Sequence, residues 1–125
     1  QGLPRAQCCL GYCTEKGIGT EADPAAAAEW YRRSAEGGYS RGMYNYACCF
    51  ENGTGVKKDL PLAQQWYERA AKEGLPDAMY ELGVWYEDGR CGPKDAAQAL
   101  AWYKKAAEAG HDRARKAVER MEKLV

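Results

Sequence analysis

The chain has 125 residues, enough for one ordinary domain, and its 18 basic and 18 acidic side chains cancel. Without a net charge there is no overall field to attract nucleic acid or an anionic membrane, so we expect neither as a partner. No apolar run is long enough to cross a bilayer, and the first residues carry no signal-peptide pattern, so we expect no membrane insertion.

The first predicted helix covers residues 5–16, and similar segments at 41–52 and 77–88 follow it at intervals of 36 residues. Apolar and small residues at helical spacing predict which side of each helix is buried. In the first helix they predict a core contribution from Ala6, Leu10, Cys13 and Thr14. Each of these helices is expected to end at a glycine in the left-handed conformation. The three glycines are Gly17, Gly53 and Gly89.

A second helix is expected in each unit, beginning after an aspartate whose side chain caps the first-turn N–H groups. The aspartates are Asp23, Asp59 and Asp95. A Trp-Tyr pair recurs in these helices at 30–31, 66–67 and 102–103, and we expect each tyrosine in the core with the tryptophan packed beside it. The last helix, near 112–124, places Ala114 and Val118 toward the core and charged residues outside, as in a capping helix.

The fixed period of 36 residues predicts a solenoid, in which each unit packs only against its neighbours. We expect an all-α, right-handed α/α superhelix of three helix-turn-helix units, near 5–38, 41–74 and 77–110, with a C-terminal capping helix. This forms a single domain over residues 1–125. Because Gly2-Leu3-Pro4 repeats Gly74-Leu75-Pro76 from a junction between units, and the chain does not begin with Met, we also expect a fragment of a longer protein.

The third unit contains a recognisable string of residues. It reads Ala78-x3-Leu82-Gly83-x2-Tyr86-x2-Gly89, then Asp95, Ala99, Trp102-Tyr103, Ala106-Ala107 and Gly110. This string resembles the Sel1-like repeat, a relative of the tetratricopeptide repeat with a longer internal loop, and the second unit matches it from Gly53 to Gly74. The resemblance implies a non-catalytic scaffold or adaptor that binds a protein or peptide.

The candidate binding surface is the side of each first helix that faces away from the core. In a two-helix solenoid the first helices line the concave wall, and related repeats use the same positions for peptide contacts. One tyrosine per unit supplies a low-entropy anchor on this wall. Its charge changes from basic to acidic along the array, so we expect a segment whose basic end lies over unit three; a solvated helix face is the alternative. The candidate residues are Arg5, Tyr12, Arg41, Tyr44, Asn45, Cys48, Asn52, Asp77, Tyr80, Glu81, Val84 and Asp88.

Few residues could support catalysis, so we expect neither enzyme activity nor a cofactor. The two serines, Ser34 and Ser40, are not followed by a lysine three residues on, as a Ser-x-x-Lys nucleophile requires. The single histidine, His111, falls in the last turn between helices, where it is expected to serve the turn or the next helix start rather than act as a base.

Six cysteines leave a different class of function open. They are Cys8, Cys9, Cys13, Cys48, Cys49 and Cys91. As a set they do not recur every 36 residues, so we expect reduced thiols and favour a reducing, cytoplasmic compartment, with a periplasmic or secreted location left open. Cys8, Cys9 and Cys48 are expected on the concave side, where they could form a metal or redox site. A structural spacer within a longer protein is the remaining alternative, and the array is expected to be monomeric.

Overall fold

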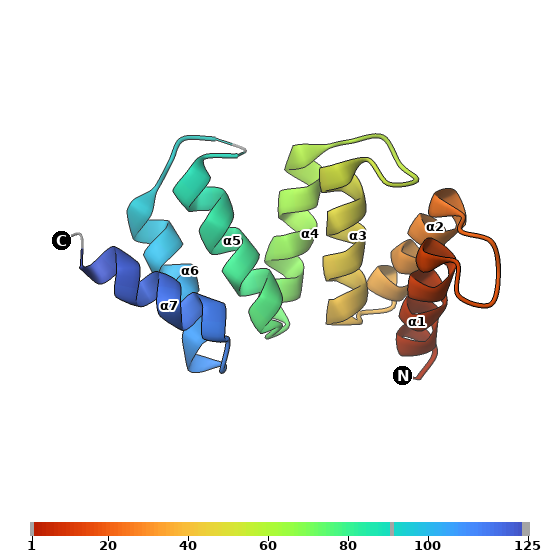
Figure 1. The fold of residues 1–125 in the computed structure, drawn as a ribbon, viewed down its shortest axis with the longest axis horizontal. Coiled ribbons are helices and arrows are strands. Elements are labelled where there is room, and N and C mark those ends of the chain that lie inside the picture. Colours follow the sequence, from red (N-terminus) through yellow and green to blue (C-terminus); the bar gives the residue numbers. More distant parts are fainter. Residues whose placement is uncertain (1, 91, 124–125) are drawn as a thin grey trace.

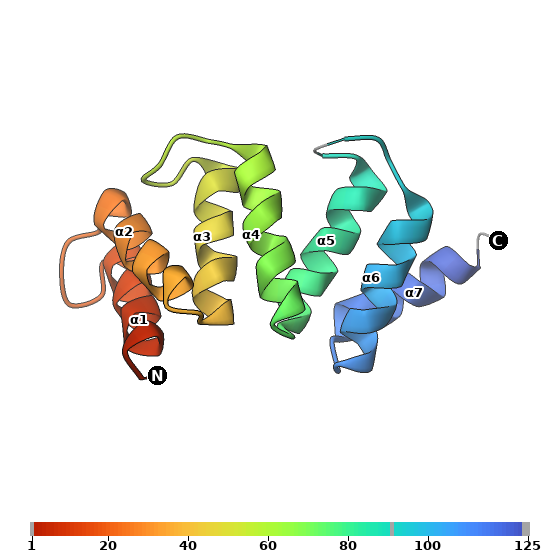
Figure 2. The same cartoon turned by 180° about the vertical axis from the view of Figure 1, so that it is seen from behind.

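The computed structural model describes residues 2–90 and 92–123, which form seven helices and no strand. The helices are α1 (Gly2–Lys16), α2 (Pro24–Glu36), α3 (Ser40–Asn52), α4 (Leu60–Lys72), α5 (Pro76–Asp88), α6 (Ala96–Glu108) and α7 (Asp112–Glu122). They follow one another along the long axis, with the two chain ends at opposite ends of the array (Figures 1 and 2). The predicted all-α solenoid of three helix pairs and a capping helix is therefore confirmed.

The helix boundaries follow the predicted signals. Asp23 caps α2 by accepting the Ala26 N–H at 3.1 Å, and Asp59 and Asp95 cap α4 and α6 in the same way. Gly53 ends α3 with a φ of 71°, in the left-handed region that favours glycine. The turns from α2 to α3 and from α4 to α5 lie at the edge opposite the α3–α4 connection (Figure 1). Each pair of helices is thus antiparallel, and successive pairs stack side by side.

The core consists of the predicted tyrosines and the small residues that face them. Tyr31, Tyr67 and Tyr103 are 1–2% exposed. A Cβ atom at Gly83 would lie 2.5 Å from the Tyr103 ring, so glycine there allows the two helices to approach closely. The tryptophans of the three Trp-Tyr pairs lie beside this core and are half-buried, as expected. Each also lies beneath a cation three residues later in its helix; Arg69, for example, lies 4.4 Å from the centre of the Trp66 ring.

The buried side predicted for the first helix is wrong at Ala6 and Leu10, whereas Cys13 and Thr14 are half-buried. Leu10 is 46% exposed and Ala6 is exposed, whereas Cys8, expected on the concave side, is only 5% exposed. The equivalent residue of Leu10 in α5, Leu82, is fully buried because α4 covers that side of α5. In the described residues no helix precedes α1, so the same side of α1 remains open.

The capping helix meets its prediction more closely. Ala114 is fully buried and Val118 is half-buried against the last part of the core, while Ala117 and Met121 are buried as well. The other side of α7 is charged and exposed. In the part of the chain that the structure describes, no helix is both long and apolar enough to span a membrane.

Candidate functional site

The exposed sides of α1, α3 and α5 form what we call the first-helix face, and three pockets lie along it. Nine of the twelve candidate residues line these pockets. The other three do not: Arg5 is exposed, Val84 packs against the core, and Asp88 is exposed beside Arg90. Most of the residues predicted to face away from the core therefore line pockets, and their role in binding stays a prediction.

The pocket at the third unit has a volume of about 400 Å³ and lies between α3, α5 and the start of α7. Its walls include Tyr44, Tyr80 and His111, and the His111 ring stacks on Tyr80 at 4.8 Å between centres. His111 caps α7, since its Nδ1 accepts the Ala114 N–H at 3.1 Å. Its Nε2 lies 3.1 Å from Asp77 Oδ1, so the ring proton of the neutral form is on Nε2.

The expected turn role of His111 is confirmed, but its place in this pocket was missed. The signal was available in the repeat. The equivalent residues before α3 and α5 are Tyr39 and Leu75, neither of which caps its helix through a side chain. A histidine at that position departs from the pattern and adds a polar ring to the first-helix face.

Most of the acidic group predicted over unit three is already paired within the chain. Asp77 Oδ2 lies 2.8 Å from Arg41 Nη2, and Arg120 and Arg90 pair with Glu87 and Asp88. Glu81 differs, because no basic side chain in residues 2–90 or 92–123 lies within ion-pair distance of it. Burial, then the nearby Glu51 carboxylate, raises the pKa of Glu81 above its usual range. Glu81 is thus the acidic group of this pocket that forms no direct ion pair, although Arg113 also lines the pocket.

A tyrosine–glutamate hydrogen bond recurs in every unit and ties the second helix to the first. Tyr31, Tyr67 and Tyr103 donate to Glu15, Glu51 and Glu87, each at 2.7 Å. Both residue types recur at 36-residue intervals, so the sequence contained the signal, but it does not show that the tyrosine hydroxyl reaches across to the glutamate. These bonds satisfy the polar end of an otherwise apolar core residue.

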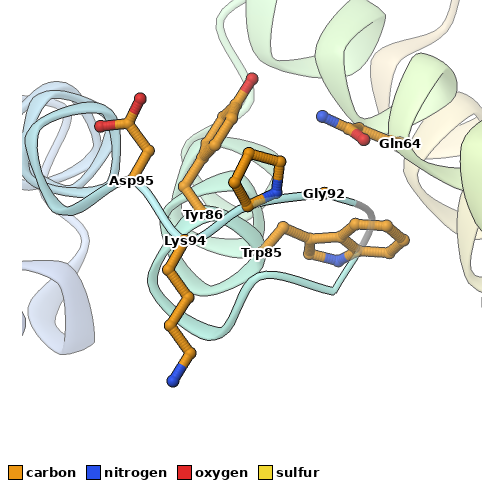
Figure 3. Close-up of a pocket in the computed structure, with 7 residues that line it drawn as sticks. Gln64, Trp85, Tyr86, Gly92, Lys94 and Asp95 are labelled. Atoms are coloured by element: carbon orange, nitrogen blue, oxygen red, sulfur yellow. The ribbon is translucent and has the colours of Figure 1, made fainter.

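A further pocket, of about 190 Å³, lies where α4 and α5 meet the loop before α6. Figure 3 shows Trp85, Tyr86 and Gln64 around it, together with Gly92, Lys94 and Asp95 of the loop. Its Trp85 side chain packs edge-on against Tyr67, with ring centres 5.8 Å apart. None of the candidate residues lines this pocket, so it is separate from the first-helix face.

Three of the five described thiols are poorly suited to thiolate chemistry. Burial raises the pKa of Cys48 to about 11 and that of Cys49 to about 12, and it also raises the pKa of Cys8. These groups are therefore protonated at neutral pH, whereas metal ligation and disulfide exchange require the thiolate. The five described cysteines are free, and Cys91 lies outside the described residues.

Alkylation should distinguish the thiols by their surroundings. With iodoacetamide at mildly alkaline pH, we expect exposed Cys9 to react first and Cys49 to react at least roughly tenfold more slowly, because burial both blocks access and suppresses ionisation. Peptide mass spectrometry over a time course measures each rate. In denaturant the two rates should converge, and fast reaction of Cys49 in the folded protein would contradict its burial.

Known proteins show the same repeat. The family model for the Sel1 repeat matches residues 4–39, 40–75 and 76–111. A crystal structure of a Sel1 repeat protein from Oxalobacter formigenes is 35% identical, with a TM-score of 0.87 over 92% of this chain and 47% of the other. The crystal structure of c5321, a protective antigen of uropathogenic Escherichia coli strains, is 32% identical, with a TM-score of 0.89 over 97% of this chain and 26% of the antigen.

Two further matches extend the comparison. Cysteine rich protein B of Helicobacter pylori is 24% identical with a TM-score of 0.77, over 91% of this chain and 88% of that one, and shows the fold alone. Chitin synthase regulatory factor 3 of Schizosaccharomyces pombe is 44% identical over 41 residues, which is 33% of this chain. The present chain spans only 4% of that fungal protein and less than half of the first two structures.

Proposed function

Since the chain belongs to the Sel1 repeat family, whose members are generally protein-interaction scaffolds, we propose that it binds a peptide segment or partner protein along the first-helix face. The observation that carries the proposal is the third-unit pocket, where two tyrosines and an unpaired carboxylate surround about 400 Å³. No enzyme activity is part of the proposal. In this proposal the array supplies the binding surface, and any activity of the complex belongs to the partner.

The two tyrosines are held in place before any partner arrives. Tyr44 packs edge-on against buried Tyr67 at 5.5 Å, and Arg41 lies over its ring at 5.3 Å. Tyr80 is fixed between Tyr103 and His111, at 5.5 and 4.8 Å. Rings that are already immobilised lose little conformational entropy on binding, which favours them as anchors for a partner.

Charge supports one orientation of the bound segment. Within the described residues Glu81 forms no ion pair, and although Arg90 and Arg113 offset part of the effect, its raised pKa reflects the cost of holding that charge in a partly buried position. A lysine or arginine of the partner would relieve that cost and complete an ion pair at the third unit. We therefore propose that a basic side chain of the partner lies near Glu81. Of the acidic residues that the sequence predicted to face the basic end of the partner, only Glu81 is then assigned this role.

Peptides selected from a random display library provide the test. We expect the Y44A and Y80A variants to bind the selected peptides at least roughly tenfold more weakly, because each removes an aromatic anchor. Fluorescence anisotropy with a labelled peptide measures the loss. The matched control is R69A on α4, an exposed change outside the first-helix face, which should leave the affinity unchanged.

Two variants that each remove one negative charge refine the same experiment. E81Q should weaken the binding of peptides that carry a basic residue. D88N removes an exposed carboxylate that already lies beside Arg90, so it should leave their binding unchanged. Selection of peptides that bind Y44A and Y80A as well as the natural protein would exclude the third-unit pocket as the binding site. A protein that selects no peptides at all would favour the structural-spacer alternative.

A further inference from the structure

Units two and three use their recurring glutamate to bind an arginine as well as a tyrosine. Arg90 Nη1 lies 2.6 Å from Glu51 Oε2, and Arg120 Nη1 lies 2.7 Å from Glu87 Oε2. Arg120 also reaches Glu87 Oε1 through Nη2 at 3.0 Å, although that oxygen already accepts the Tyr103 hydroxyl. A carboxylate in this position can therefore accept two N–H groups of a guanidinium and still accept the hydrogen bond from the tyrosine hydroxyl.

Unit one lacks the arginine. Arg90 and Arg120 follow their glutamates by 39 and 33 residues, and the same offsets from Glu15 lead to Thr54 and Cys48. Neither residue is basic. Within residues 2–90 and 92–123, Glu15 accepts the Tyr31 hydroxyl on Oε1 but takes part in no ion pair. The second carboxylate oxygen, which is bound to a guanidinium in the other two units, has no such partner here.

A pocket of about 210 Å³ occupies the place of the missing side chain, several times the roughly 30 Å³ that one water fills in the liquid. Glu15, Cys48 and Thr54 line it, and Asn45 and Asn52 add side-chain amides. Tyr12, which is 51% exposed, forms the outer wall. Lys16 also lines the pocket, but its ammonium lies over the Tyr12 ring, 6.0 Å from the centre, rather than on Glu15.

We propose that this pocket binds the guanidinium group of an arginine side chain from a partner. Glu15 accepts two of its N–H groups, as Glu87 does from Arg120. The Tyr12 ring offers a face on which the planar group can stack once Lys16 moves aside. Arginine is favoured over lysine because both internal occupants of the equivalent position are arginines, and because the planar guanidinium can direct two parallel N–H groups to the two carboxylate oxygens. The proposal rests on the proposed function only for the source of the arginine.

A small probe tests the pocket without a partner protein. N-acetyl-arginine amide is titrated into ¹⁵N-labelled protein, and we expect saturable amide shifts near Glu15, Asn45 and Thr54. E15Q should weaken binding roughly tenfold, the change that about 1.4 kcal/mol produces, since glutamine can still accept from Tyr31 but carries no charge. N-acetyl-lysine amide should bind more weakly than the arginine probe.

Two substitutions test the role of the arginine, one by adding it beside Glu15 and one by removing it from Glu51. T54R places an arginine at the position of Arg90 and should fill the pocket from within, so the shifts near Glu15 should be lost. R90T should open the equivalent site at Glu51 and add a second set of saturable shifts there. The matched control is E51Q in the natural background, where Arg90 already occupies the site, so binding near Glu15 should be unchanged.

Three results would overturn the proposal. They are the absence of saturable shifts in the natural protein, an affinity of E15Q for the arginine probe equal to that of the natural protein, or such an affinity of T54R. Far-UV circular dichroism establishes that each variant is folded. The outcome is independent of the peptide selection, which depends on Tyr44 and Tyr80. An arginine probe that binds near Glu15 when no peptide depends on those tyrosines would uphold the pocket and reject the proposed function.

Discussion

Replacing Leu82 by alanine should lower the free energy of unfolding by about 2–5 kcal/mol, the usual cost of removing a buried leucine side chain. Leu82 is fully buried in the central core cluster, together with Tyr67 of α4 and Trp85 of α5. The substitution removes that packing and leaves a cavity between two units. Urea unfolding followed by circular dichroism measures the change in the midpoint and the slope.

Leu10 provides a control of the same residue type in the same position of the repeat. It lies 72 residues before Leu82 and is 46% exposed, because no described helix covers that side of α1. L10A should therefore cost less than about 1 kcal/mol. A loss for L10A as large as that for L82A would mean that α1 is covered in solution. Concentration-dependent unfolding would then identify a second copy of the chain as the cover.

Replacing Gly42 by alanine should destabilise the protein by about 1–2 kcal/mol, even though alanine favours helix. An added Cβ would lie 2.7 Å from Ser34 Cβ and 3.1 Å from the Ala35 backbone nitrogen, and closer still to the Ser34 hydroxyl. Overpacking of this kind costs about 1–3 kcal/mol, which outweighs the roughly 0.5–1 kcal/mol that alanine gains over glycine in a helix. Thermal or urea unfolding of G42A measures the net loss.

The repeat indicates which second change should compensate. At the equivalent contact between units two and three, Ala70 and Ala78 replace the serine and glycine, and both are fully buried. S34A alone should cost about 1 kcal/mol because it removes the hydrogen bond from Ser34 to the Pro4 carbonyl, 2.6 Å long. The double variant S34A/G42A should be more stable than the sum of the two losses predicts, by about 1 kcal/mol. Strict additivity would show that the two side chains do not share this space.

The period of the repeat is the part of the sequence that predicted most of the fold. Because every unit packs against a similar unit, the capping aspartates, the terminating glycines and the buried tyrosines could each be recognised three times. The first helix was the exception: its residues have the same spacing as those of α5, but burial depends on the neighbouring helix. Sequence periodicity describes a helix surface and contains nothing about what covers it.

The candidate site was predictable in outline only. Side chains that face away from the core could be located from helical spacing, and most of them line pockets. The ion pairs could not be found in this way, since Arg90 and Arg120 reach their glutamates from different positions of the repeat. His111 was assigned correctly to a turn, but its contacts with Asp77 and Tyr80 depend on how α7 approaches α5.

Glu51 and Glu87 each pair with an arginine of the next segment, Arg90 of unit three and Arg120 of the capping helix, so the order of the segments is chemically meaningful. Deleting unit two would place the Arg90 position directly after Glu15 and close the pocket there. Duplicating unit one would create a second glutamate without an arginine. Gene-level shuffling of such repeats could therefore change the ligand preference of an array without altering any single residue, since the junctions rather than the units would specify it.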